Sequence, residues 1–141
     1  MEKMFELLKQ DHRRVSQIIN QMMKSSGTDR EDLLDELTDE LDEHMDIEET
    51  YLYPKLESIA ETKNIIRDSY EEHKMVKNQL EKLQEISVDE DEWDNTLQAM
   101  KENIDRHVKQ EETNTFPLAQ KLLNKQQLQE TNQEIVDKKA A

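Results

Sequence analysis

Two copies of one eleven-residue pattern constrain the fold of this chain more than any other feature. The first copy runs from His44 to Pro54 and the second from His107 to Pro117. In both, Glu-Glu-Thr begins four residues after the histidine, and an aromatic residue precedes the proline. Side chains four residues apart lie one turn above each other on the same face of an α-helix. Each copy therefore predicts a helix that presents an imidazole and a carboxylate to one point.

Apolar residues recur at three- and four-residue steps, which predicts four long amphipathic helices. We expect them over about residues 2–24, from 28 to a kink or break at Pro54, over 63–85, and from about 88 to a second break at Pro117. Short connections make consecutive helices antiparallel neighbours. The predicted fold is all-α: an up-down-up-down antiparallel four-helix bundle over residues 1–123. A polar C-terminal segment over 124–141 should form a short, frayed helix or a tail.

Composition excludes several functional classes. The net charge is -15 over 141 residues, which argues against nucleic acid or an anionic membrane as a partner. The chain has no cysteine, so a disulfide framework, an iron–sulfur cluster and a thiol nucleophile are all excluded. No run approaches the roughly 20 apolar residues that span a membrane. The first residues contain no apolar run typical of a signal peptide, so we expect a cytoplasmic protein.

All four histidines of the chain fall within the apolar stripe of a predicted helix, one histidine per helix. In antiparallel helices of these lengths, with a rise of about 1.5 Å per residue, the histidine-bearing turns reach similar heights. The four imidazoles and two of the glutamates can therefore converge inside the bundle. The candidate metal ligands are His12, His44, Glu48, His73, His107 and Glu111.

This set of donors suits a pair of metal ions. If each glutamate bridges both metals and one oxo or hydroxo group is shared, each metal has five bonds and one open position. Mixed imidazole and carboxylate ligands without thiolate suit iron, with zinc or manganese as alternatives. A buried ionised glutamate is costly unless a cation accompanies it, which favours a metal site over a purely structural histidine cluster.

Several neighbouring residues are less clear candidates. Glu49 and Glu112 follow their histidines by five residues, so we interpret them as solvated charges rather than ligands. Asp11 and Glu72 precede His12 and His73 and should point about 100° away, to the exterior. Tyr51 lies in the same stripe as His44 and Glu48. Its hydroxyl could reach a ligand or the metal, but we favour a core tyrosine with a backbone partner.

The order of these histidines and glutamates, with the aromatic-Pro closures, resembles the hemerythrin-like domains, also called HHE cation-binding domains, over about residues 4–123. The resemblance implies an up-down four-helix bundle with a non-haem di-iron centre and the six ligands named above. Oxygen-carrying hemerythrins have a second histidine on the third helix, where this chain has Lys77, and an aspartate five residues after the last histidine. The donor set is more similar to iron–sulfur repair di-iron proteins, which carry a cysteine-bearing segment, and to peroxide-decomposing hemerythrin-like proteins.

We therefore predict a protein with two iron ions, bridged by an oxo or hydroxo group, that reacts with or senses oxygen, nitric oxide or peroxide. The alternatives are an iron store or donor for iron–sulfur repair, and a catalase-like di-iron enzyme. Because Lys77 replaces a nitrogen ligand of the oxygen carriers, we expect the reduced protein to be oxidised by oxygen without returning it.

Overall fold

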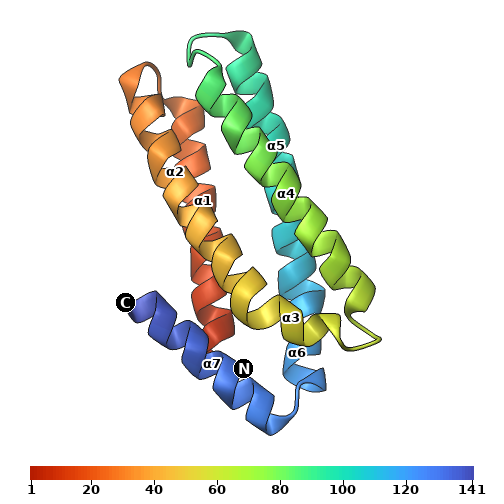
Figure 1. Ribbon diagram of the computed structural model, residues 1–141. Coiled ribbons are helices and arrows are strands. Elements are labelled where there is room, and N and C mark those ends of the chain that lie inside the picture. The colour runs from red at the N-terminus through yellow and green to blue at the C-terminus, as the bar shows by residue number, and fades with distance from the viewer.

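The computed structural model describes residues 1–141, and its architecture is entirely helical. The four long helices are α1 (Lys3–Lys24), α2 (Thr28–Ile47), α4 (Lys63–Glu85) and α5 (Asp91–Gln110). They run along one axis, with the α1–α2 and α4–α5 connections at the same end (Figure 1). The predicted antiparallel four-helix bundle with a C-terminal helix is confirmed. None of these helices has a stretch long and apolar enough to cross a membrane.

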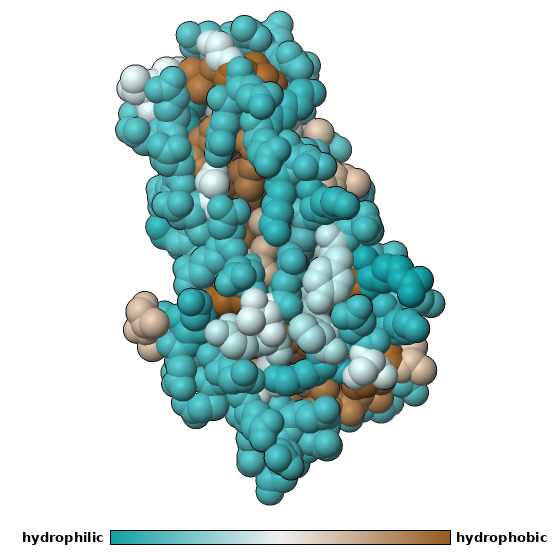
Figure 2. All heavy atoms as spheres, viewed as in Figure 1, coloured by the Kyte–Doolittle hydropathy of each residue, from teal (hydrophilic) through white to brown (hydrophobic).

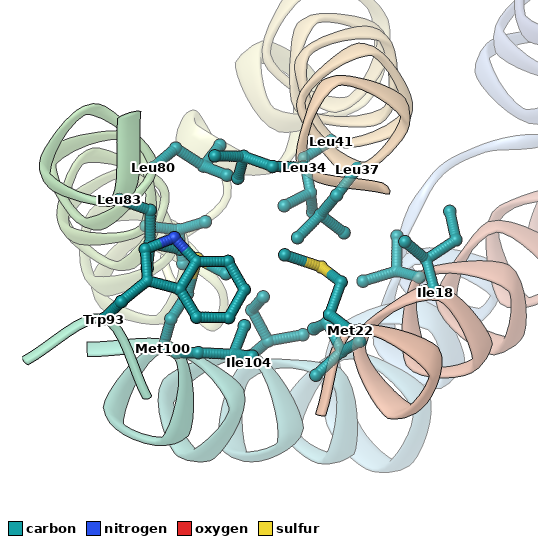
Figure 3. Close-up of a cluster of buried hydrophobic side chains, with 14 of the residues drawn as sticks. Ile18, Met22, Leu34, Leu37, Leu41, Leu80, Leu83, Trp93, Met100 and Ile104 are labelled. Atoms are coloured by element: carbon teal, nitrogen blue, oxygen red, sulfur yellow. The ribbon is translucent and has the colours of Figure 1, made fainter. Parts of the chain in front are cut away.

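An apolar cluster fills the end of the bundle that carries these two connections. Met22, Leu37 and Trp93 project from α1, α2 and α5 into one interior (Figure 3). Burying a side chain of this size contributes roughly 1.5–3 kcal/mol, so the cluster stabilises the bundle without help from polar groups. The outer surface is mostly hydrophilic, and apolar atoms show through it in small patches along the upper half and at the lower right of the molecule (Figure 2).

The opposite end of the bundle contains two single π-helical turns, which lie directly before the prolines. α2 passes through the π turn Glu48–Leu52 into α3 (Tyr53–Glu57), and α5 passes through Glu111–Thr115 into α6 (Phe116–Leu122). Proline lacks an N–H group, and its ring clashes with the carbonyl four residues earlier. The wider turn accommodates both effects, so the backbone stays helical where we expected a kink or a break.

The segment after Asn124 forms a regular helix, α7 (Lys125–Ala140), which crosses the end of the bundle beside α1 (Figure 1). A capping box begins it: the Asn124 side chain accepts a hydrogen bond from the Gln127 amide at 2.8 Å, and the Gln127 side chain accepts one from the Asn124 amide at 3.0 Å. Ile135 is fully buried, and the Asn132 side chain accepts a hydrogen bond from the Met4 amide at 2.8 Å. These contacts hold α7 against the end that carries the histidines.

Candidate metal centre

The six candidate ligands lie together in two overlapping groups. One consists of His12, His44, Glu48 and Glu111, and the other of Glu48, His73, His107 and Glu111. Within each group the donor atoms lie within 4.8 Å of one another, and all six residues are buried. Both glutamates belong to both groups, so each carboxylate is placed between two pairs of imidazoles.

The distances between donor atoms match those around a metal ion. His12 Nε2 lies 3.1 Å from Glu111 Oε1, and His73 Nε2 lies 3.1 Å from Glu48 Oε1. The two Nε2 atoms of His73 and His107 lie 3.2 Å apart. Nitrogen and oxygen ligands bind transition metals at about 2.0–2.2 Å, which separates adjacent ligands by roughly 3–3.5 Å. The spacing of the donor atoms is therefore that of a metal site.

A carboxylate outside the cluster holds the other ring nitrogen of each histidine. The Nδ1 atoms of the four imidazoles lie 2.7–2.9 Å from these carboxylates, in the pairs His12–Glu112, His44–Asp11, His73–Glu49 and His107–Glu72. A proton on Nδ1 donates to the carboxylate and leaves the lone pair of Nε2 facing inward. Carboxylates in this position fix the tautomer and orientation of metal-binding histidines.

These four outer carboxylates correct our interpretation of the neighbouring acids. We expected Asp11 and Glu72 to face the exterior and Glu49 and Glu112 to be solvated, but each bonds to a histidine on another helix. Asp11 is buried, and the side chains of Glu49 and Glu112 are only 27% and 33% exposed. Our reasoning considered each acid on its own helix, whereas a residue beside the inner stripe reaches across the helix–helix boundary.

The inner donor atoms lack enough protein partners. Glu48 Oε2 and His44 Nε2 are buried without a hydrogen bond, although Glu48 Oε1 lies 3.2 Å from that nitrogen. Burial favours neutral His44, but the Glu48 charge and the Asp11 hydrogen bond outweigh it and raise the His44 pKa to about 10. Positive charge is therefore favoured among these atoms. A divalent cation fits the same place and would satisfy several of them at once.

Tyr53, rather than Tyr51, contacts the cluster. Its hydroxyl donates a hydrogen bond to Glu111 and lies 3.1 Å from Glu48 Oε1. Burial, reinforced by these two carboxylates, raises the Tyr53 pKa well above its ordinary value, so the phenol stays a proton donor. Tyr51 is only partly buried and packs beside the apolar cluster at this end of the bundle. The π turn contributes to the difference, because its extra residue moves the inward face beyond Tyr51 to Leu52 and Tyr53, which are both fully buried.

The second copy of the pattern has a phenylalanine at the position of Tyr53. The Phe116 ring stacks on His12, with centroids 5.9 Å apart and planes 6° from parallel. The Tyr53 hydroxyl instead lies 3.2 Å from His73 Nε2. The two halves of the cluster therefore share ligand types but have different aromatic neighbours.

A small cavity of about 30 Å³ adjoins all four imidazoles on the side of the apolar core. The rest of its lining is aliphatic or thioether: Val15, Leu41, Met45, Val76, Ile104 and Val108. Lys77 does not reach the cluster; its Nζ lies 3.7 Å from Glu49 Oε2, and its side chain is 47% exposed. The space beside the imidazoles is thus apolar and large enough for only a few atoms.

Glu72→Gln should weaken metal binding without preventing folding. The change removes the charge that orients His107, and loss of such a partner typically costs about 10–100-fold in metal affinity. Competition with a chelator at equilibrium measures this. The matched control is Glu71→Gln, which changes an exposed neighbour on the same helix. Equal affinities in the two variants would show that the Glu72 carboxylate does not support the site.

Comparisons with known proteins concern the family and the fold of this chain. Residues 3–119 match the family model described as the hemerythrin HHE cation binding domain. A crystal structure of a hemerythrin HHE cation binding domain-containing protein, the Rv2633c homolog from Mycobacterium kansasii, is similar with a TM-score of 0.81 and 24% sequence identity. The likeness covers 97% of this chain and 84% of that one, and at this identity it supports the fold alone. No curated protein sequence matches the chain.

Proposed function

Because the chain belongs to the hemerythrin HHE cation-binding domain family, we propose that its cluster holds a non-haem di-iron centre. Each group of donors would hold one ion with two histidines and two glutamates, and both glutamates belong to both groups. Ligands of this kind, without thiolate, suit iron, and zinc or manganese are the alternatives. The ligands in this proposal are His12, His44, Glu48, His73, His107 and Glu111.

The proposed activity is reaction with a small uncharged ligand: oxygen, nitric oxide or hydrogen peroxide. The cavity is the observation that carries this proposal, because it adjoins all four imidazoles and has room for only a few atoms. Its aliphatic lining disfavours ions, which lose hydration there without gaining a partner. A bound iron pair, held by the histidines that line this cavity, would supply the redox chemistry.

The protein side chains have separate roles in this proposal. The four outer carboxylates orient the imidazoles through their Nδ1 protons. The Tyr53 hydroxyl donates its proton in a hydrogen bond to the Glu111 carboxylate and so orients that ligand. Val76, Ile104 and the other aliphatic residues limit water in the cavity. Glu48 and Glu111 are fully buried, which favours a retained reactive centre over an iron donor that releases its metal readily.

Rapid mixing of the reduced iron protein with each ligand tests the proposal. We expect about two irons per chain, since the two groups of donors are equivalent in number. Oxygen or peroxide should oxidise the reduced protein, and flushing with argon should not restore the reduced spectrum. Iron-replete cells that yield protein without bound iron would overturn the di-iron assignment. A visible band that appears in air and vanishes under argon over repeated cycles would instead indicate an oxygen carrier.

The cavity gives this experiment a specific variant. Val76→Ile adds one methylene to the lining and should slow the reaction with oxygen while the iron content stays the same. Overpacking a site costs about 1–3 kcal/mol, so a decrease of about tenfold is expected. Val88→Ile is the control, since Val88 packs against the apolar cluster at the far end of the bundle. Equal rates for both variants would mean that the ligand does not enter through this cavity.

A further inference from the structure

The C-terminal helix places a lysine against one of the outer carboxylates. Lys139 Nζ lies 2.7 Å from Asp11 Oδ1, while Asp11 Oδ2 accepts the His44 Nδ1 hydrogen bond at 2.9 Å. The two oxygens of one carboxylate are thus divided between a cation on α7 and an imidazole of the metal cluster. The Lys139 and Asp11 side chains are only 19% and 9% exposed. At such low exposure, solvent screens an ion pair much less than at the surface.

This contact has no close equivalent elsewhere in the cluster. Glu49 has Lys77 as its nearest cation, at 3.7 Å and on a half-exposed side chain. Glu72 and Glu112 form ion pairs only with their histidines. The two halves of the chain otherwise repeat the arrangement of histidines and acids, whereas α7 follows the second half and has no counterpart in the first. The half of the cluster with His12 and His44 therefore receives an added charge that the other half lacks.

We propose that Lys139 is a positioning residue for the metal site, acting on His44 through Asp11. The ammonium fixes the rotamer of Asp11 and hence the plane of the imidazole. Lys139 thereby makes the two metal positions inequivalent. It holds in place the ligands of the position that contains His12 and His44.

The same contacts couple the docking of α7 to metal binding. Besides Lys139, α7 is held by Lys55, whose Nζ lies 2.6 Å from Thr131 Oγ1 and 2.9 Å from Glu134 Oε1. If Lys139 favours a well-oriented His44, a bound metal must in turn favour docked α7, because coupling between two binding events is reciprocal. Amide hydrogen exchange in α7 should therefore be slower in metal-loaded protein than in metal-free protein.

Cobalt(II) is a suitable probe, because it tests the positioning role without relying on reactivity with oxygen, nitric oxide or peroxide. In Lys139→Met, release of one cobalt to a chelator should be about tenfold faster, within the range found for loss of a supporting residue, and the second ion should leave at its wild-type rate. Lys138→Met is the matched control, since Lys138 is an exposed neighbour on α7. Lys139→Arg keeps the charge and should restore slow release.

Proton NMR of the cobalt protein separates positioning from general support of the fold. Each cobalt-bound histidine should give one strongly shifted, exchangeable Nδ1 proton, four signals in all. In Lys139→Met one signal should move and exchange faster with solvent, and Asp11→Asn should affect the same one. Unchanged signals and release rates, or an equal change in all four signals, would overturn the proposal. Wild-type protein that takes up no cobalt would overturn the metal site itself, and the role of Lys139 with it.

Discussion

Replacing either shared glutamate by alanine should empty the metal centre. Glu48 and Glu111 each belong to both groups of donors and are fully buried, so one substitution removes a ligand from both ions at once. We expect the metal content of Glu48→Ala and Glu111→Ala to fall from about two ions per chain to nearly none. Metal analysis after purification from iron-replete cells measures this. Glu43→Ala, at an exposed position on α2, controls for the loss of an acid and should retain full metal content.

Alanine variants of the outer glutamates should lose less metal than those of Glu48 and Glu111. Glu49→Ala and Glu112→Ala each remove the carboxylate that holds one imidazole, at His73 and His12. Their metal affinity should fall by about 10–100-fold, with ions still bound at high metal concentration. If Glu112→Ala empties the site while Glu111→Ala leaves it full, the ligand on α5 follows its histidine by five residues instead of four.

The bundle and the convergence of the six candidate residues are readable from the sequence for one physical reason. His44 and Glu48 occupy positions at which the helical repeat predicts an apolar core residue. The same is true of His107 and Glu111. A polar residue in a core position must meet a partner, and only the other helices can provide one. The spacing therefore determines both the helices and the side chains that meet inside them.

The contact made by Tyr53 could not be found in this way, because it depends on a change of helical pitch. Counting 3.6 residues per turn from His44 leads to Tyr51, and the count fails at the π turn that precedes Pro54. The aromatic-Pro pair was the sequence signal that could have identified Tyr53. In both copies it marks the residue that becomes buried beside the cluster, Tyr53 in the first and Phe116 in the second.

The roles of the outer carboxylates and the docking of α7 as a regular helix were not predicted, because contacts between helices decide them. Asp11 belongs to α1, yet it serves His44 on α2 and receives Lys139 from α7. The inward face of α7 has few apolar residues. Its packing therefore depends on Ile135, on its capping box and on polar contacts, which leave no periodic pattern in the sequence. The sequence signal was an acid directly beside a candidate ligand, at His12 and Glu48 in the first half of the chain and at His73 and Glu111 in the second.

Metal-free and metal-loaded protein should respond to pH in opposite directions. In the metal-free protein, burial lowers the pKa of His44, but Glu48 and Asp11 raise it overall, to about 10, and the pKa of His73 is also raised. A group whose pKa is higher in the folded state stabilises the fold fully below its unfolded value, here 6.5. That contribution is lost as pH rises toward 10. Glu111 has a lowered pKa, so its contribution is lost only under acidic conditions.

The metal-loaded protein has the reverse dependence. Imidazole and carboxylate bind a metal only when deprotonated, so binding releases protons and strengthens as pH rises. Below the pH at which protons compete for His44 and His107, the metal should be lost together with its stabilisation. Between pH 6 and pH 9 the stability of the metal-free protein should thus fall while that of the metal-loaded protein holds or rises.

Thermal unfolding of zinc-loaded and chelator-treated protein at pH 6 and pH 9 tests this without redox chemistry. Each pKa unit corresponds to about 1.4 kcal/mol, so the metal-free protein should melt roughly 10 °C lower at pH 9 than at pH 6. The melting temperature of the zinc-loaded protein should not be lower at pH 9 than at pH 6. Because binding releases protons, adding zinc at pH 8 to weakly buffered protein should acidify the solution. Asp11→Asn removes one cause of the raised His44 pKa and should flatten the metal-free curve. Parallel pH profiles for the two forms would show that protons and metal do not compete for these histidines.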